Sequence, residues 1–414
     1  MKKSIILLTA ALLMLPACEK LASEEREEDL KPEDITPAVS LELTKADAGI
    51  RDASNTSGLD VFSRLYAVRD GKDVSFSPLS LSLAFAMVAE GAEGETYKQI
   101  SDAFGWGDAT KEELGAFYKK MIEGLVIADP SVSFTSSNSL WAAQNLVLKD
   151  KYKKLLSENF AAESYQVDFS AAATLGKINK WCSDKTDGKI QKMLDELNPA
   201  TRMMLINALL YKAPWAMTWT VEKKRTFKDE SGAKSKKDYL YVKGMYRYAY
   251  LDECQAIALP YGNGAYEMVV FLPNPGYTVE KILPTVRENG GKLGMPRTAE
   301  IWLPKFSTEY STEAALPTIL MDKGIRLAFT GAADFSGISA SEALKISLVL
   351  QKVKIDVTEK GTEFAAVTVI GMDYGASPDS TPPQPVVFDA DHPFVYLIRE
   401  TSTGTILLVG SLSK

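Results

Sequence analysis

Residues 352–358 alternate between polar and apolar side chains, a pattern that predicts a β-strand with one buried face. The segment Glu359-Lys360-Gly361 that follows is typical of a turn. Residues 362–370 again have the composition of a strand, because they are rich in β-branched and small side chains and carry a single charge. Residues 371–385 are rich in Gly, Ser and Pro, which predicts an exposed loop that proteases can reach. The sequence therefore places a segment able to form a strand directly before an exposed loop.

Apolar positions at helical spacing predict an amphipathic helix over residues 47–68, and a second helix is expected from residue 78. Ser77 offers an N-cap to this second helix, and Pro78 suits its first position. The second helix is apolar on all sides, so we expect it to be buried. The inner positions expected of the first helix are Ile50, Leu59, Phe62, Leu65 and Tyr66.

Two β-hairpins are expected nearer the C-terminus. Gly262-Asn263-Gly264 separates two runs of strand-like composition and is typical of a tight turn. A second turn is expected at Thr403-Gly404, within residues 392–412.

The chain has 414 residues, of which 46% are hydrophobic and 24% are charged, so it can bury a large core. Length alone favours two or three domains. Residues 50–414 contain no segment with the composition of a linker, however, so we expect one domain over residues 46–414.

The first residues have the features of a secretory signal peptide. Lys2 and Lys3 precede an apolar run at residues 5–17, which is shorter than the about 20 residues needed to span a membrane. Leu15-Pro16-Ala17-Cys18 resembles a bacterial lipobox, in which the cysteine becomes the lipidated first residue after cleavage; an accidental cysteine after a plain signal peptide is the alternative. We therefore expect residues 1–17 to be removed and Cys18 to anchor the protein at the outer membrane, the cell surface or in the periplasm.

Residues 18–45 predict an acidic, disordered spacer between the lipid and the domain. Charged residues are dense there, aromatic residues are absent, and Pro32 and Pro37 interrupt any long helix. The acidic residues at 24–29 also resemble the surface-export signals of some bacterial lipoproteins, with a plain spacer as the alternative.

Removal of Lys2 and Lys3 would change the formal net charge from −7 to −9. An acidic mature chain argues against nucleic-acid binding, which requires a basic patch, and the membrane is expected to be reached only through the lipid. Cys182 and Cys254 would remain, and we expect two free, buried thiols. Because one His and two Cys cannot form a tetrahedral metal site, neither a metal nor a cofactor is expected.

Many segments, in one fixed order, resemble the serpin family. Among them are FSPLSLSLAFAMVAEGAEGETYKQI at residues 76–100 and LINALLYKAPWAMTW at residues 205–219. The resemblance covers about residues 50–412 and implies an α+β fold of about eight or nine helices around three β-sheets, with an exposed reactive-centre loop at about residues 359–385. It also implies a monomer. The other matching segments are residues 137–169, 178–190, 258–274, 301–310, 324–339 and 392–412.

The sequence does not favour an enzyme. A hydrolytic triad needs a general base, and the single histidine, His392, follows Asp391 at the start of a strand, where a structural role is favoured. The absence of a catalytic group agrees with the serpin resemblance, because in serpins the chemistry belongs to the target protease.

The resemblance implies suicide inhibition of a serine protease, with a cysteine protease as the alternative target. The protease attacks the exposed loop, forms an acyl-enzyme and is trapped when the cleaved loop inserts into the central sheet. Phe364 departs from the alanine that is usual in the hinge of inhibitory members: its ring either slows insertion, which would make the protein a substrate, or enters a local pocket. The hinge residues that do match are Glu359, Gly361, Thr362, Glu363, Ala365 and Ala366.

By position, Ser77, Ser80 and Asn207 match polar residues of the serpin shutter, the region that opens the central sheet. Trp215 matches the tryptophan at the top of that opening. The shutter histidine of the family is replaced by Gln351, which can both donate and accept hydrogen bonds. The network is therefore expected to persist without its pH sensitivity.

Counting from Glu359, as in typical inhibitory members, places the scissile bond between Gly375 and Ala376. Small residues suit elastase-like proteases, whereas the alternative positions Met372 and Tyr374 suit chymotrypsin-like ones. Residues 362–392 contain no Arg or Lys, so trypsin-like targets are not expected. Two other interpretations stay open: a non-inhibitory serpin that is cleaved as a substrate or binds a ligand, and a lipid-tethered structural or adhesion protein.

Overall fold

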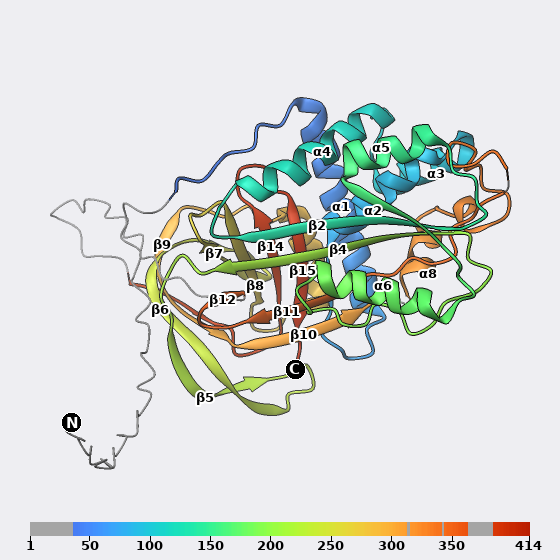
Figure 1. Ribbon diagram of the computed structural model, residues 1–414. Helices are drawn as coiled ribbons and strands as arrows, with labels where there is room; N and C mark the ends of the chain where they lie inside the picture. Colours follow the sequence, from blue (N-terminus) through green and yellow to red (C-terminus); the bar gives the residue numbers. More distant parts are fainter. Residues whose placement is uncertain (1–35, 313–314, 342, 363–383) are drawn as a thin grey trace, which may run out of the picture.

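The computed structural model describes residues 36–312, 315–341, 343–362 and 384–414 (Figure 1). Within these residues the chain forms eight α-helices and three β-sheets, which confirms the expected α+β class. The helices are α1 (Lys45–Ala67), α2 (Pro78–Gly91), α3 (Gly94–Phe104), α4 (Lys111–Ile127), α5 (Asp150–Phe160), α6 (Ala172–Lys185), α7 (Val279–Asn289) and α8 (Leu316–Asp322).

Side-chain caps set the starts of the first two helices. Thr44 and Asp47 form a capping box, so α1 begins at Lys45, two residues earlier than expected. Ser77 Oγ accepts a hydrogen bond from the Ser80 N–H at 3.1 Å, and Pro78 occupies the first position of α2, as expected. All five expected inner positions of α1 are buried, and twelve of the fourteen residues of α2 are buried.

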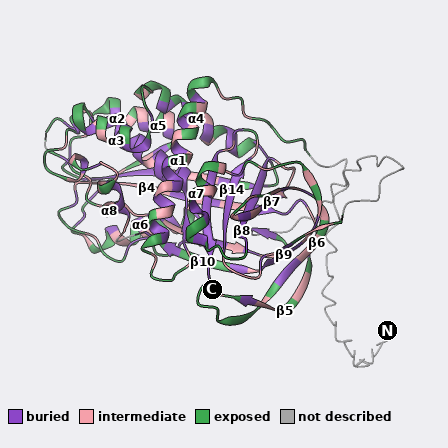
Figure 2. Ribbon diagram, turned by 180° about the vertical axis from the view of Figure 1, so that it is seen from behind, coloured by how far each residue is buried: buried purple, intermediate pink, exposed green. Residues whose placement is uncertain are grey.

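A nine-stranded sheet forms the largest part of the core. Every residue of β8, β14 and β15 is buried, and these strands lie in the middle of the purple region of Figure 2. The two expected hairpins are confirmed as β7–β8 and β14–β15. The strand order is β1 (Ser75–Phe76), β15 (Ile406–Leu412), β14 (Phe394–Glu400), β8 (Tyr266–Pro273), β7 (Cys254–Tyr261), β6 (Lys234–Tyr250), β9 (Pro296–Pro304) and β13 (Val386–Asp389), with β5 (Thr220–Lys228) paired to β6.

The remaining strands form two smaller sheets. One has the order β12 (Gly361–Thr362), β4 (Met203–Pro214), β2 (Ser133–Ala143) and β3 (Ala162–Val167), and the other pairs β10 (Phe306–Ser311) with β11 (Lys352–Val357). The strand β11 confirms the alternating pattern, since Ile355 and Val357 are buried and Lys354 is exposed. Helix α6 lies across the four-stranded sheet, where Trp181 meets the ring of Trp141 edge-on at 6.4 Å (Figure 1).

The end of the expected spacer is part of the domain. Residues 36–44 run along α4, where the Val39 N–H donates to the Ala128 carbonyl at 3.1 Å. Leu41 packs so closely on α4 that a Cβ on Gly124 would lie 2.7 Å from its side chain. Residues 36–44, which belong to the expected spacer, thus contact α4 of the domain.

Candidate functional site

The start of the expected reactive-centre loop is held at the end of the four-stranded sheet. After β11 the chain turns at Glu359, and Gly361 and Thr362 pair with Pro214 and Ala213 of β4. Gly361 has a φ of +136°, and a Cβ there would lie 2.1 Å from the Ala213 carbonyl oxygen, so only glycine fits this approach. The pairing of β12 with β4 thus depends on the residue type at position 361.

Side chains around this turn fix it further. Thr362 is 4% exposed, and its hydroxyl lies 2.8 Å from the Tyr261 hydroxyl. The Trp215 indole donates to the Thr358 carbonyl at 2.8 Å and stacks on Tyr261, with ring centroids 4.4 Å apart. Lys305 forms an ion pair with Glu359 and, by hydrogen bonding to it, lowers the pKa of that carboxyl. The hinge therefore starts from a well-anchored point.

The strands β4 and β11 each present an edge without a strand partner among the described residues. Strand β4 pairs with β2 through residues 203–212, but its other edge pairs with β12 only at Ala213 and Pro214. Strand β11 pairs with β10 alone. Two cavities lie between β4 and the segment that leads into and forms β11. Unpaired strand edges are templates for an added strand.

The cavity nearer the hinge, which we call the hinge-side cavity, has a volume of about 50 Å³. Its lining combines apolar, aromatic and polar side chains of β4, β11, β12 and the buried strands below. Among these are Leu209, Tyr211, Val353, Thr362, Ile398 and Leu408. The Tyr211 hydroxyl is buried without a hydrogen-bond partner, and burial raises the pKa of Tyr211.

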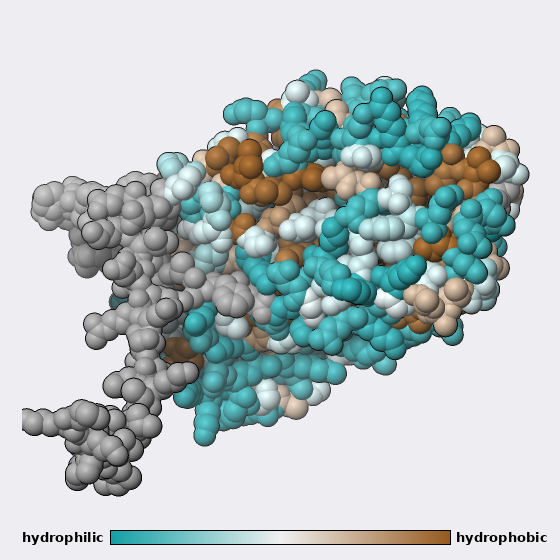
Figure 3. All heavy atoms as spheres, viewed as in Figure 1, coloured by the Kyte–Doolittle hydropathy of each residue, from teal (hydrophilic) through white to brown (hydrophobic). Residues whose placement is uncertain are grey.

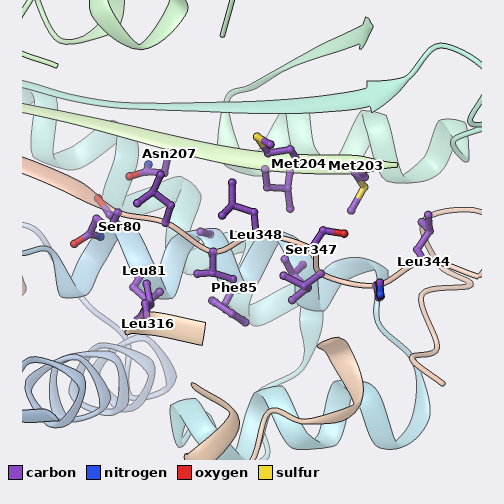
Figure 4. A pocket seen from close by; sticks show the side chains of 18 of the residues that line it. Ser80, Leu81, Phe85, Met203, Met204, Asn207, Leu316, Leu344, Ser347 and Leu348 are labelled. Carbon is purple, nitrogen blue, oxygen red and sulfur yellow. The ribbon is translucent and has the colours of Figure 1, made fainter. Parts of the chain in front are cut away.

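The second cavity, the shutter cavity, has a volume of about 70 Å³ and reaches from Asn207 to Met203 along β4. Ser80 Oγ and Asn207 Oδ1 line it and are both buried without a partner. Figure 4 shows these two side chains close together at one end of the cavity, with Met203 and Leu344 toward the other end. Buried polar atoms without partners are costly, so this region is ready to form further hydrogen bonds.

Gln351 connects the shutter to α2. Its Oε1 accepts from the Ser77 N–H at 2.6 Å and its Nε2 donates to the Ser77 carbonyl at 3.0 Å, which uses both capacities of the amide. Ser77 Oγ donates to the Leu407 carbonyl at 2.6 Å while capping α2. The structure thus brings together Ser77, Ser80, Asn207 and Gln351.

Other expected site residues lie elsewhere or outside the described residues. His392 contacts Asp391 through Nδ1 at 2.7 Å and the Pro273 carbonyl through Nε2 at 3.0 Å, and both contacts are compatible with the structural role expected of it. Cys182 and Cys254 are free and buried, as expected. The residues expected to form the reactive loop and the lipid anchor lie outside the described residues: Cys18, Glu363, Phe364, Ala365, Ala366, Met372, Tyr374, Gly375 and Ala376.

Three residues that contribute to the site could not be identified from the sequence. Tyr261 and Lys305 hold the hinge, and Asn138 accepts from the Asn207 amide at 2.8 Å. Each comes from a segment distant in sequence, and a polar residue within a strand is not in itself unusual. Across the described residues, we find no group of three side chains suited to a metal ion and no helix long and apolar enough to cross a membrane.

Comparison with known proteins matches residues 52–414 to the family described as serpin, serine protease inhibitor. The chain is 32% identical over 405 residues to Iripin-2 of Ixodes ricinus, covering 94% of this chain and all of that protein. It is 30% identical over 380 residues to a serine protease inhibitor of Cyanea capillata, covering 87% and 97% of the two chains.

Among solved structures, the native state of the thermophilic serpin tengpin superposes with a TM-score of 0.79 at 25% identity, covering 92% of this chain and 97% of that one. The arrangement of helices and sheets is therefore the serpin fold. The chain belongs to the serpin family, whose members are protease inhibitors rather than enzymes.

Proposed function

We propose that this protein inhibits serine proteases by offering residues 363–385 as bait and, after cleavage, inserting the first part of them between β4 and β11. Such insertion is established for serpins in general. The observation that carries the proposal for this chain is the unpaired edge of β4, which continues directly from the β12 pair over residues 203–212.

The pairing of β12 with β4 sets the register of insertion. Thr362 lies opposite Ala213, so an antiparallel continuation places residues 363–372 opposite residues 212–203. Thr368 then faces Asn207, whose Oδ1 is buried without a partner in the uninserted state. A hydroxyl opposite this atom supplies a donor that the shutter cavity lacks.

The energy of insertion is large in this register. About eight to ten new ladder hydrogen bonds, each worth roughly 1 kcal/mol net, supply on the order of 10 kcal/mol. Ordinary domains have a total stability of roughly 5–15 kcal/mol. The uninserted state is therefore held by a kinetic barrier, at the hinge and the shutter.

The same register predicts where Phe364 lies in the inserted state. Directly opposed residues of an antiparallel pair lie on one face, so Phe364 shares a face with buried Thr362 and lies opposite Tyr211, beside the hinge-side cavity. That cavity measures about 50 Å³, well below the roughly 150 Å³ of an engineered protein cavity that binds benzene. We therefore expect the ring to enter only as β4 and β11 separate. This register therefore supports the second alternative for Phe364, in which its ring enters a local pocket and does not slow insertion.

We assign the target class from the expected scissile region. Gly375 or Ala376 before the cut suits elastase-like proteases, and Met372 or Tyr374 suits chymotrypsin-like ones. Mass spectrometry of the fragment released by a target protease locates the bond, and a cut outside residues 372–377 contradicts this placement.

The proposed function is tested by incubation with elastase, chymotrypsin and subtilisin, followed by a denaturing gel. A protease adduct that survives denaturation is the expected result. Cleavage without an adduct indicates a substrate-type serpin, and a loop that none of the three proteases cleaves favours the structural or adhesion alternative.

We also propose that the protein is a lipoprotein attached through Cys18. The supporting feature is the sequence of residues 1–18 alone. Replacing Cys18 with Ser should release the protein from the membrane fraction into the soluble fraction; an unchanged distribution contradicts the assignment.

A further inference from the structure

The hairpin of β5 and β6 is locally basic in an acidic chain. Residues 220–238 carry seven Lys or Arg and four Asp or Glu, a net charge of +3, whereas the whole chain has −7. Figure 3 shows the surface over this hairpin, at the lower left of the molecule, as strongly hydrophilic. Five of the lysines are exposed and form no ion pair with any described residue: Lys223, Lys224, Lys228, Lys234 and Lys236.

None of the four acidic residues of the hairpin forms an ion pair with the five lysines. Glu222 forms an ion pair with Arg225, and Glu230 forms one with Arg69. Asp229 accepts from the Ser231 N–H at 2.8 Å, and Asp238 accepts from the Lys224 N–H at 3.3 Å. The hairpin therefore keeps a net charge of +3, and its five exposed lysines have no ion-pair partner within the described part of the molecule.

Two features of these lysines reduce the stability of the hairpin. Lys228 and Lys234 are directly opposed across the hairpin, and like charges in that arrangement repel. The ladder has a bulge between Glu222 and Arg225, and there Lys224 has a φ of +61°, which is unfavourable for a residue other than glycine. A bulge redirects side chains, and here two consecutive lysines are exposed.

The hairpin is joined to the strand that follows the reactive loop. The Lys228 N–H donates to the Asp391 carbonyl at 2.8 Å, and Arg225 forms an ion pair with Asp389 of β13. Asp391 lies five residues beyond Val386, a distance of roughly 17 Å along an extended chain. A small domain is about 30 Å across, so a protease engaged with the loop can reach this surface.

We propose that the five lysines, the hairpin surface, dock an acidic patch of the target protease beside the reactive loop. The proposal rests on the proposed function and names the electrostatic character of its partner. Exposed charges of this kind raise the rate of encounter more than the final affinity. The hairpin surface thus selects among proteases by charge, while the loop selects by residue type.

The test measures the second-order rate of protease trapping between 20 and 200 mM NaCl. One variant combines Lys228→Gln, Lys234→Gln and Lys236→Gln. The matched control combines Lys119→Gln, Lys177→Gln and Lys281→Gln, so that both variants lose the same net charge. These three lysines lie exposed on α4, α6 and α7 and form no ion pair with a described residue. Thermal unfolding verifies that both are folded.

With an acidic protease, trapping by the hairpin variant should be about tenfold slower at low salt, and the difference should shrink as salt screens the charges. The control should stay within twofold of the wild type. With a basic protease that also attacks the loop, the hairpin variant should be no slower than the wild type.

Equal slowing of both variants, or slowing of neither, overturns the proposal. Slowing that occurs only when a polyanion such as dextran sulfate is added also overturns it, because the surface would then serve a polymer. Cleavage of the loop without any adduct contradicts the proposed inhibition, yet the same comparison can still be made on the cleavage rate, so the two failures are distinguishable.

Discussion

In the proposed mechanism, Phe364 is the residue that decides between inhibitor and substrate. In the proposed register, its ring would enter the hinge-side cavity only in the inserted state, so it should stabilise the cleaved form and not the intact one. We expect Phe364→Ala to destabilise the cleaved form by about 3 kcal/mol, seen as a lower unfolding temperature, and to leave intact protein unchanged. A rise in the fraction of protease trapped would instead show that the ring obstructs insertion.

Glu90 of α2 gives the molecule a pH dependence unrelated to the loop. Burial raises the pKa of Glu90 from 4.5 to about 7, and its Oε1 is buried without a partner. Between about pH 4.5 and 7 the folded state therefore binds more protons than the unfolded state, so stability falls as pH rises through this window and stays lower above it.

We expect Glu90→Gln to raise the unfolding temperature at pH 8 and to reduce the loss of stability between pH 5 and 8. Glu288→Gln, at an exposed position of α7, is the matched control. If the unfolding temperature depends on pH in the same way for Glu90→Gln and the wild type, the folded protein tolerates the charge of Glu90 without loss of stability.

For single residues, the sequence predicts contacts between near neighbours along the chain but not contacts between distant segments. Ser77 and Pro78 could be assigned to the start of α2 because a cap depends on neighbours within one turn. Tyr261 and Lys305 could not be assigned to the hinge, since their contacts cross more than fifty residues of chain.

Among the elements, the start of α2 is tied by Gln351 to the segment that leads into β11. Gln351 satisfies both the N–H and the carbonyl of Ser77, and its own N–H is satisfied by Thr312 Oγ1 at 2.9 Å. Gln351→Ala leaves the buried Ser77 N–H without a partner, whereas the Ser77 carbonyl still accepts from the Leu81 N–H at 3.2 Å. The loss should cost about 2 kcal/mol and lower the urea midpoint. Gln144→Ala, at an exposed position, should have no effect; similar midpoints for both variants would contradict the role of Gln351.

The alternating pattern of residues 352–358 predicted β11, but no pattern could show that β11 and β4 lie apart. Strand composition reports which faces are buried and not which edges are paired. The separation is set by the turn at Glu359, the approach at Gly361 and the contacts of Gln351, all of which are tertiary. The family resemblance supplied the expectation of a sheet that opens, and the pairing of β12 with β4 is the basis of the register that we propose.

For the whole molecule, insertion should be visible as a difference in stability between intact and cleaved protein. In the proposed register Ala366 lies opposite Leu209, on the face shared with buried Thr362. Ala366→Arg would bury an unpaired charge only in the inserted state, where such burial is strongly unfavourable. We therefore expect the intact variant to unfold like the wild type, and its cleaved form to lack both the gain in unfolding temperature and the protease adduct.

Ser380→Arg is the control, because residue 380 lies beyond residues 363–372, which fill the edge of β4. It should retain the gain in stability and the adduct, although it adds the same charge to the loop. Cutting both variants with a chymotrypsin-like protease avoids cleavage at the new arginine. If both lose the adduct, charge anywhere in the loop disturbs the protease; if neither does, the loop does not enter the sheet in this register. Inhibition is tied to the edge of β4 only if Ala366→Arg loses the adduct and Ser380→Arg keeps it.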